Sequence, residues 1–476
     1  MHRLLAHRLF PALVAASLTV ACGTALRVAG IEGTGDSNGS ASGYGSLFVN
    51  GREFDTSLTE FRLNGASVTE ADIKVGMQTS VQGDLLAEQA SSVSARRALL
   101  APIDGIARVG AVKTASLSVL GQNVRVDEMT RLIGITLDEL DSDMLVDIHA
   151  LVPASGEALA TYLAVADSDY SAGSQPLTLT GFVDTLSATE LTIGSLTVDV
   201  SAATVVDAVA IGDRVTVTGQ QPTRGGTLFA SVVTPAPAAP TPATYADRAV
   251  VVDAIDGSRV RGGQTEIELA DAQRRDTAAQ SIDVGAHLLA RGPVDDSGLL
   301  NAADYWVIPA PDVLLHGVVA SLTPNIQVLD QALNVQPLTQ YIESRPGQPR
   351  QFSATDLQLG DALALVGYFD QSGQLVVTRM ERTPADPIAA VYGVLSDIVA
   401  GVTSNTLVIG GVNVITDDNT VYESVGGTEI SETVFLATAT TGLLVQAWGE
   451  EVTGAHTLLA SRVRLLNSEE DIATAR

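Results

Sequence analysis

The stretch Val209-Ala210-Ile211-Gly212-Asp213-Arg214-Val215-Thr216-Val217-Thr218-Gly219 decides the fold class of this chain. After Gly212, valine alternates with charged and hydroxyl residues until Gly219. A period of two is typical of a strand with one face buried and the other in water. The stretch therefore predicts a half-buried β-strand that lies between two glycines.

The four residues that open this stretch follow a local pattern that recurs along the chain: apolar, any residue, apolar, glycine. The copies are Ile73-Lys74-Val75-Gly76, Val209-Ala210-Ile211-Gly212, Ile282-Asp283-Val284-Gly285 and Leu357-Gln358-Leu359-Gly360. Their spacings are 136, 73 and 75 residues, and the first is close to two periods of 68. Self-similarity at a nearly fixed period indicates a repeat array.

Each copy has further recurring parts. It opens with a glycine and a short apolar strand, as in Gly181-Phe182-Val183, and continues with a hairpin such as 191–200, whose central Gly194 suits the positive φ of a tight turn. Pieces such as Leu137-Asp138-Glu139-Leu140 and Asp271-Ala272-Gln273-Arg274-Arg275-Asp276 allow no more than a helical turn or two. Five short strands with a helical turn after the third is the order of an OB-fold or a similar Greek-key barrel.

The predicted fold class is therefore all-β, with about six tandem, small, five-stranded OB-like β-barrel repeats of roughly 60 to 75 residues. A chain of 476 residues also exceeds what one hydrophobic core usually serves. The expected repeats are 43–99, 100–168, 175–233, 245–309, 312–383 and 388–467, followed by a tail at 468–476. Repeat 2 lacks the closing glycine that the other copies carry. The closing glycines are Gly83, Gly219, Gly292, Gly367 and Gly449.

A Pro/Ala-rich linker at 234–244 forms the clearest boundary between repeats. It contains Thr234-Pro235-Ala236-Pro237-Ala238-Ala239-Pro240-Thr241-Pro242, which favours a stiff polyproline-type spacer. We expect this spacer to hold the two halves of the molecule apart.

The N-terminus has the pattern of an export signal at residues 1–21. Arg3 and Arg8 precede an apolar run at 9–20, which is too short to span a bilayer, and Cys22 follows. This region resembles the lipobox of bacterial lipoproteins, in which that cysteine is lipidated, although Thr19 stands where the family prefers leucine. The alternative is an ordinary secretory signal with an incidental cysteine. By the same resemblance, Gly23 favours sorting to the outer membrane, with the body of the protein facing the periplasm or the cell surface.

Residues 22–42 are rich in glycine and serine, and we expect them to form a flexible tether. Because Cys22 is the only cysteine, the chain can form no intramolecular disulfide. The formal net charge of −28 repels phosphate backbones, so nucleic-acid binding is not expected. The expected partners are the membrane, through the lipid on Cys22, and an envelope protein or a glycan.

The opening of the first copy carries a family resemblance. Gly30-Ile31-Glu32-Gly33-Thr34-Gly35, followed by Gly43-Tyr44-Gly45-Ser46-Leu47-Phe48-Val49-Asn50-Gly51-Arg52-Glu53-Phe54-Asp55-Thr56, resembles bacterial lipoproteins that carry domain of unknown function 5666. The later copies are similar to the looser repeat of that family. The resemblance implies an envelope lipoprotein with repeated small β domains, and it implies no catalytic residue.

Candidates for catalysis or metal binding are few. Outside the signal, the histidines are His149, His287, His316 and His456, none with a second His or a Cys within ligand spacing. His149 and His287 lie on predicted strands, where a hydrogen-bonded structural histidine is the favoured interpretation. Gly35-Asp36-Ser37-Asn38-Gly39 has the letters of a nucleophile elbow, but that motif needs a strand before it and a helix after it, so chance is the better explanation.

Two further groups suggest ligands. Acidic clusters are candidates for calcium, yet none continues into a twelve-residue calcium loop, so solvated turns are favoured. These clusters are Asp138, Glu139, Asp141 and Asp143; Asp417, Asp418 and Asn419; and Asp36 with Asn38. Trp306, Trp448 and Tyr305 could stack on sugars, although core or rim packing is favoured for both tryptophans.

We therefore predict no catalytic, cofactor or metal site, and lipidation at Cys22. The expected function is that of a non-enzymatic envelope scaffold for binding or spacing. The alternative is an envelope protein that binds a glycan or a divalent cation.

Overall fold

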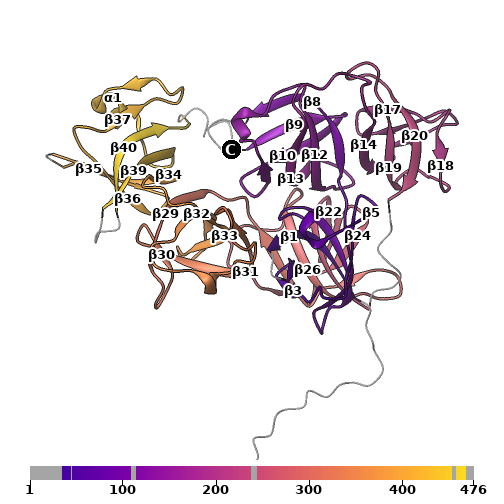
Figure 1. Ribbon diagram of the computed structural model, residues 1–476, viewed down its shortest axis with the longest axis horizontal. Helices are drawn as coiled ribbons and strands as arrows, with labels where there is room; N and C mark the ends of the chain where they lie inside the picture. The colour runs from indigo at the N-terminus through magenta and orange to yellow at the C-terminus, as the bar shows by residue number, and fades with distance from the viewer. Residues whose placement is uncertain are drawn as a thin grey trace, which may run out of the picture. The chain divides into compact units, whose positions relative to one another are not determined.

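The computed structural model describes residues 35–43, 46–108, 114–236, 244–401, 403–452 and 457–467, which fold into small closed five-stranded β-barrels in tandem (Figure 1). Repeat 2 shows the ring most simply: β8 pairs with β9, β9 with β10, β10 with β13, β13 with β12, and β12 with β8. Among these five pairings, only the one between β10 and β13 is parallel. This is the strand order of an OB-fold, as predicted.

The first three repeats contain β1 to β20. Repeat 1 has β1 (Gly35–Gly43), β2 (Leu47–Val49), β3 (Arg52–Phe54), β4 (Glu60–Leu63), β5 (Ala66–Val68), the 3₁₀ turn η1 (Glu70–Asp72), β6 (Gln78–Asp84) and β7 (Gln89–Ala95). Repeat 2 has β8 (Leu99–Arg108), β9 (Ala115–Val119), β10 (Gln122–Val126), β11 (Arg131–Ile133), η2 (Leu137–Glu139), β12 (Leu145–Leu151) and β13 (Ala158–Asp167). Repeat 3 has β14 (Leu177–Phe182), β15 (Thr185–Leu186), β16 (Glu190–Ile193), β17 (Leu196–Asp199), β18 (Thr204–Val205), β19 (Arg214–Gln220) and β20 (Leu228–Pro235).

The last three repeats contain β21 to β40. Repeat 4 has β21 (Tyr245–Val251), β22 (Ala254–Asp256), β23 (Arg259–Gly262), β24 (Thr265–Glu268), β25 (Gln273–Arg274), β26 (His287–Pro293), β27 (Leu300–Asn301) and β28 (Asp304–Ile308). Repeat 5 has β29 (Val313–Ser321), β30 (Gln327–Val328), β31 (Gln331–Glu343), η3 (Ala354–Asp356), β32 (Ala362–Phe369) and β33 (Leu375–Thr383). Repeat 6 has β34 (Ala389–Val399), β35 (Asn405–Ile409), β36 (Val412–Thr416), β37 (Val421–Glu423), β38 (Glu429–Ile430), α1 (Glu432–Thr438), β39 (Leu444–Val452) and β40 (Thr457–Leu465).

The alternating stretch that predicts the fold is strand β19. Val215 and Val217 are completely buried, and each buried valine stabilises the barrel by about 1.5 to 3 kcal/mol relative to an exposed one. At Gly219 the register with β20 shifts, and a Cβ on this glycine would overlap the backbone carbonyl of Phe229. The closing glycine is thus required because a β-bulge brings two backbones together. Repeat 2 makes the same bulge with Ala150.

The other recurring glycine, which ends the apolar-x-apolar-glycine pattern, lies at a tight corner that is hydrogen-bonded near the end of the first strand of its repeat. Gly212 has a φ of 87°, in the left-handed region that favours glycine, and its N–H donates to the carbonyl of Val183 at 2.8 Å. The same bond occurs in all six repeats. The donor–acceptor pairs are Gly76–Ala41, Asp143–Ile103, Gly212–Val183, Gly285–Val252, Gly360–Val319 and Gly442–Leu395. Repeats 2 and 6 thus contain the corner although they lack the apolar-x-apolar-glycine pattern.

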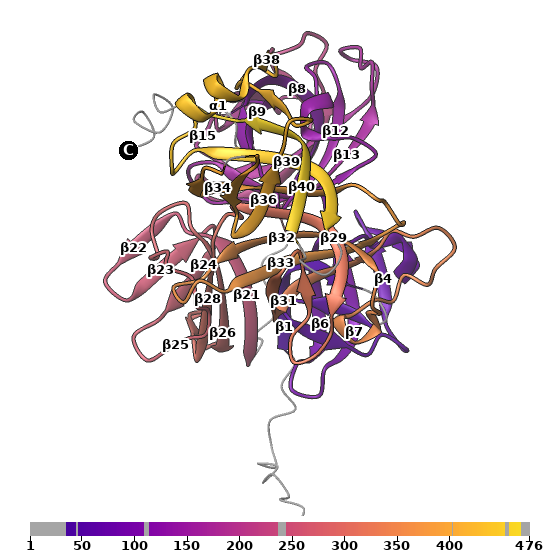
Figure 2. The ribbon, with the colours of Figure 1, turned by 90° about the vertical axis from the view of Figure 1, so that its left-hand side faces the viewer.

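The barrels are joined in pairs through their first strands. β14 pairs antiparallel with β8, and β34 pairs antiparallel with β29 (Figure 1). Figure 2 shows the neighbouring strands β29, β32 and β33 of repeat 5 side by side. Each of these pairs encloses one continuous hydrophobic core, formed by repeats 2 and 3 and by repeats 5 and 6. Repeats 1 and 4 instead pair in parallel, β1 with β21, and keep separate cores.

Three expectations from the sequence are wrong. Residues 35–42 do not belong to a tether, because they form the buried strand β1; their small side chains let this strand lie between two neighbouring strands, β6 and β21. The spacer does not hold two halves apart, since β21, the first strand after it, pairs with β1. Asp271–Asp276 contains the short strand β25 rather than a helical turn.

The described residues contain no helix that is long and apolar enough to cross a bilayer. Several sequence predictions fall outside the described residues: the signal at 1–21, the lipid site Cys22, most of the linker, His456 and the tail at 468–476.

Candidate binding groove

A groove of about 390 Å³ lies at the junction of repeats 2 and 3. Four apolar residues are part of its lining: Leu99 on β8, Phe182 on β14 and Ile193 on β16, which are at most 8% exposed, and the half-buried Val152 directly after β12. Its volume falls in the lower part of the range of about 300 to 1,000 Å³ that is usual for small-molecule pockets.

Polar groups meet at one end of the groove. Gln122, at the start of β10, donates from Nε2 to the carbonyl of Ile193 at 2.7 Å. The Oδ2 atom of Asp184 accepts from the backbone N–H of Gly194 at 2.6 Å, and Asn123 adds an exposed amide without a hydrogen bond to any described residue. The described residues that line the groove include no lysine or arginine. The groove therefore offers amide and carboxylate groups beside an apolar wall.

The junction of repeats 5 and 6 has the same framework, but an aromatic ring stands where repeat 2 has a valine. Leu315 faces Val391 there as Leu99 faces Leu179 in repeats 2 and 3, and Gln331 Nε2 donates to Gly411 at 2.8 Å, much as Gln122 does to its neighbouring hairpin. The position of Val152, two residues after the bulge, is taken by Phe369. The ring of Phe369 lies against Gly411, so close that a Cβ there would be 2.8 Å from Cζ. Phe369 thus fills the space that Val152 leaves open.

A second, smaller cavity of about 80 Å³ is lined by residues of repeats 1, 2, 4 and 5. His287 faces it from β26, and burial lowers the pKa of His287 to about 4, with a further contribution from the charge of Arg125. Gln340 is 5% exposed and its Oε1 has no hydrogen-bond partner among the described residues. A cavity of this size has room for a few water molecules.

Buried ion pairs join repeats 1 and 4 beside the parallel strand pairing. Asp247 on β21 is completely buried and binds Arg52 of repeat 1 at 2.7 Å and Arg291 of its own repeat at 3.0 Å. Arg248 reaches back to Asp36 on β1, also at 2.7 Å. Burial raises the pKa of Asp36, and the positive charge of Arg248 opposes that rise. These charges fix the register of β1 against β21.

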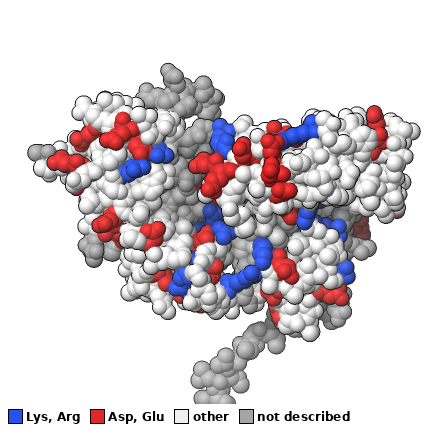
Figure 3. Space-filling view, turned by 45° about the horizontal axis from the view of Figure 1, so that its top comes forward, with Lys and Arg blue, Asp and Glu red and all other residues white. Residues whose placement is uncertain are grey.

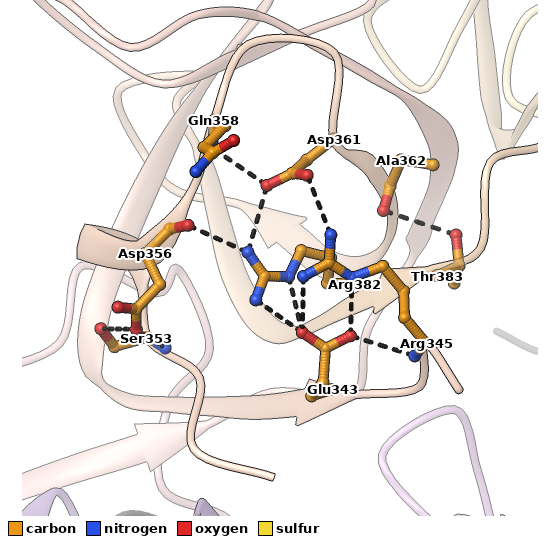
Figure 4. A network of polar contacts seen from close by, with 9 residues as sticks. All are labelled: Glu343, Arg345, Ser353, Asp356, Gln358, Asp361, Ala362, Arg382 and Thr383. Carbon is orange, nitrogen blue, oxygen red and sulfur yellow. Dashed lines mark hydrogen bonds and ion pairs between the residues drawn. The ribbon is translucent and has the colours of Figure 1, made fainter. Parts of the chain in front are cut away.

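A third polar network lies inside repeat 5 (Figure 4). The guanidinium of Arg382 binds Glu343 at 2.5 Å and Asp361 at 3.2 Å, and its carbon lies 4.4 Å from the ring centroid of Phe352. Burial alone would raise the pKa of Glu343, but hydrogen bonds from Arg345 and Arg382 hold it below its ordinary value. Repeat 6 has an equivalent cross-strand pair, Glu423 with Arg464. Because each charge has a partner, this network is structural.

The predicted histidines lie apart from one another. His149 is on β12 and His287 on β26, as expected, but the ring of His149 makes no hydrogen bond and packs edge-on at 5.4 Å against Tyr162. Burial lowers the pKa of His149 to about 3, helped by Arg97, and the backbone of Gln78 and Arg96 offsets this only in part. His149 is thus a completely buried histidine in the barrel wall, which fits a structural role.

His316 on β29 does have hydrogen-bond partners. Its Nδ1 lies 2.7 Å from the carbonyl of Ile388, and its Nε2 lies 3.4 Å from Thr383 Oγ1. These contacts tie β29 to the loop before β34 and to the end of β33, which fits a structural role.

The other candidates have structural roles as well. Ser37 of the elbow-like motif is buried within β1 and accepts a hydrogen bond from Asn50, so no strand-to-helix turn exposes it. Asp417 caps its own turn by accepting the N–H of Asn419, and Glu139 caps η2 through Thr136. Among the described residues, no three His, Cys, Asp or Glu side chains come together as a metal site would require.

The aromatic candidates do not form one platform. Trp306 lies on β28 of repeat 4 and Trp448 on β39 of repeat 6. Arg291 lies over Trp306 at 5.2 Å and Arg464 over Trp448 at 5.6 Å, so a guanidinium occupies a face of each ring.

Sequence reasoning missed the bridging glutamines. Gln122 follows Leu120-Gly121, and Gln331 follows Leu329-Asp330, at the same hairpin turn of repeats 2 and 5. The turn residues Leu120 and Asp330 have positive φ angles of 47° and 61°. An alignment of the two hairpins on these turns would have identified both glutamines as equivalent residues.

The fold and the groove define a tandem β-barrel repeat protein whose barrels associate in pairs. Three regions of the chain match the family model described as Domain of unknown function (DUF5666): residues 106–164, 180–234 and 393–464. The matches fall on repeats 2, 3 and 6, which is consistent with a repeated domain, and not on the opening of repeat 1. No match to a curated protein was found.

Proposed function

We propose that this chain is a lipid-anchored protein of the bacterial envelope, attached to the outer membrane through Cys22, and that it acts as a non-enzymatic scaffold for binding or spacing. The observation that carries the proposal is the joining of barrels through their first strands. Strand pairing and a shared core hold two barrels in one fixed relation, as in repeats 2 and 3, whereas a flexible linker would not.

The polar clusters of the described residues support a structural role. The carboxylates of Asp247 and Glu343 are each held by two guanidiniums, and Ser37 is buried in a strand. Groups that are held in this way stabilise a scaffold. Reproducible turnover of a substrate by the purified protein, lost on substitution of one polar residue, would contradict the proposal.

The scaffold can be tested by measuring how rigidly two repeats are joined. Spin labels on cysteines at Asp141 in repeat 2 and Thr189 in repeat 3, in a Cys22→Ser background, should give one narrow distance distribution. A pair at Thr189 and Thr223, both exposed in repeat 3, is the matched control within one barrel. A distribution much broader than that of the control would show that the repeats move independently.

The anchor has a direct test. Cells grown with labelled palmitate should incorporate label into the full chain, and the Cys22→Ser variant should incorporate none and should leave the membrane fraction. A single acyl chain gives only marginal attachment, so more than one is expected on the cysteine. Equal labelling of both forms would refute lipidation at this residue.

A second candidate function is ligand binding, and the groove between repeats 2 and 3 favours it. A divalent cation is the weaker choice of ligand, because calcium takes six to eight oxygen ligands and the groove lining supplies a single carboxylate.

A further inference from the structure

The groove between repeats 2 and 3 lies where the other joined pair of barrels has a larger side chain. The same two-barrel framework occurs in repeats 5 and 6, with the first strands in the same register and a glutamine bridging the two hairpins. There Phe369 fills the junction, whereas Val152 leaves a groove of about 390 Å³. The framework does not itself require the groove.

We propose that this groove binds a neutral sugar unit. The proposal rests on the binding role in the proposed function and gives it a site and a ligand class. Sugar hydroxyls both donate and accept hydrogen bonds, and they match the amides of Gln122 and Asn123 and the carboxylate of Asp184. The C–H face of a sugar ring is apolar, and the half-buried Val152 offers it an apolar contact.

Charge excludes the anionic alternatives. Asp184 is the acidic residue at the groove, the described lining has no basic side chain, and the whole chain has a net charge of −28. Acidic side chains are also spread over the face of the molecule drawn in Figure 3. A phosphate, a uronate or a nucleic acid would leave its charge unpaired against this field. A neutral ligand carries no such cost.

The size of the groove limits the ligand to about one or two sugar rings. Ligands of this kind gain little free energy per atom, so we expect dissociation constants of about 1 to 10 mM for single sugars. Weak binding by one site is compatible with a scaffold whose attachment to a polymer would be strengthened by many copies on one membrane.

The test uses the full mature chain with labelled Val, Leu and Ile methyl groups. We name N-acetylglucosamine, mannose and galactose as neutral probes and glucuronate as the anionic one, each added to about 50 mM. At least one neutral sugar should shift the methyl signals of Val152, Leu99 and Ile193 in a saturable manner, and glucuronate should not. No saturable shift from any neutral probe, or binding of glucuronate as tight as that of the neutral sugars, would overturn the proposal.

Two variants give the test its specificity. Val152→Phe copies the residue of repeats 5 and 6 and should weaken binding at least 10-fold. Asn123→Ala removes an exposed amide that makes no hydrogen bond to any described residue, so the variant should still fold. It should weaken sugar binding about 3- to 10-fold. Val206→Phe, at a half-exposed site of repeat 3, is the matched control and should bind as the native chain does.

The outcomes separate the two proposals. Unchanged binding by both Val152→Phe and Asn123→Ala would show that the sugar binds elsewhere and would refute this site. A negative result leaves the spin-label distances and the palmitate labelling untouched, so failure of the sugar site and failure of the scaffold are distinguishable.

Discussion

The substitution Asp247→Asn should weaken the junction of repeats 1 and 4 without unfolding either barrel. The carboxylate of Asp247 is completely buried and neutralises Arg52 and Arg291, whose side chains are 11% and 18% exposed. Asparagine keeps the shape but leaves two guanidiniums without their negative partner. Breaking a buried ion pair in this way costs about 3 to 5 kcal/mol, and we expect about 3 because both arginines retain some contact with water.

Hydrogen exchange is the suitable assay because it reports on each strand pairing separately, whereas a denaturant unfolding curve averages over six barrels. A loss of 3 kcal/mol corresponds to roughly a 150-fold faster exchange of the amides that pair β1 with β21, near Ser37. Amides of β26 inside repeat 4 should change much less. Glu60→Gln is the control, since it removes the partner of an exposed pair with Arg62, which contributes little. Exchange in Asp247→Asn that matches this control would refute the reasoning.

Three further predictions concern the repeats themselves. The unfolded chain protonates His149 below about pH 6.5, whereas the folded chain does so only near pH 3. The free energy of unfolding should therefore fall as the pH is lowered through this window, by up to about 1.4 kcal/mol per pH unit. His149→Leu should flatten this slope in unfolding titrations. Gly219→Ala should destabilise its barrel by about 1 to 3 kcal/mol in denaturant unfolding, whereas Ala150→Gly, at the same bulge, should cost less than 1. Thr130→Val removes a hydroxyl that is hydrogen-bonded to Asp127 and Ala160 and should cost about 1 to 3 kcal/mol by the same assay, with no loss expected to contradict us.

The fold class was predictable because its signals are local. Alternation such as that of Val215 and Val217 depends on which face of a single strand is buried, and the glycines mark a bulge and a left-handed corner. The corner occurs more widely than the apolar-x-apolar-glycine pattern, because Asp143 and Gly442 also form it without the flanking apolar residues. A backbone hydrogen bond defines the repeat more strictly than its side chains do.

What the sequence could not predict depends on contacts between distant segments. Residues 35–42 have the composition of a linker, and they become a strand because β6 and β21 satisfy their backbone groups on both sides. The groove depends on the difference between Val152 and Phe369, which has meaning only when two barrels are already placed together. None of the histidine, acidic or tryptophan candidates lines this groove.

The barrels pair because the first strand of a barrel has one edge that the barrel's own strands leave unpaired. In repeat 2 the first half of β8 pairs with β12, while β9 pairs only with the second half, from Ile103 onward. One edge of that first half is therefore open, and an open edge invites pairing with any other strand. β14 covers it in this chain, and the same division occurs in β29, which β34 covers, and in β1, which β21 covers.

This open edge explains why the repeats associate in twos. A single barrel of this design would expose unpaired backbone groups, and the first strand of a second barrel is the nearest element with the same need. Repeats 2 and 3, and likewise repeats 5 and 6, are neighbours in the chain, meet antiparallel and share a core. Repeats 1 and 4 are far apart in the chain and meet in parallel without a shared core, so their junction needs the buried charges of Asp247 and Asp36 to fix its register. The polar cluster between repeats 1 and 4 and the apolar core between repeats 2 and 3 are thus two solutions to one structural requirement.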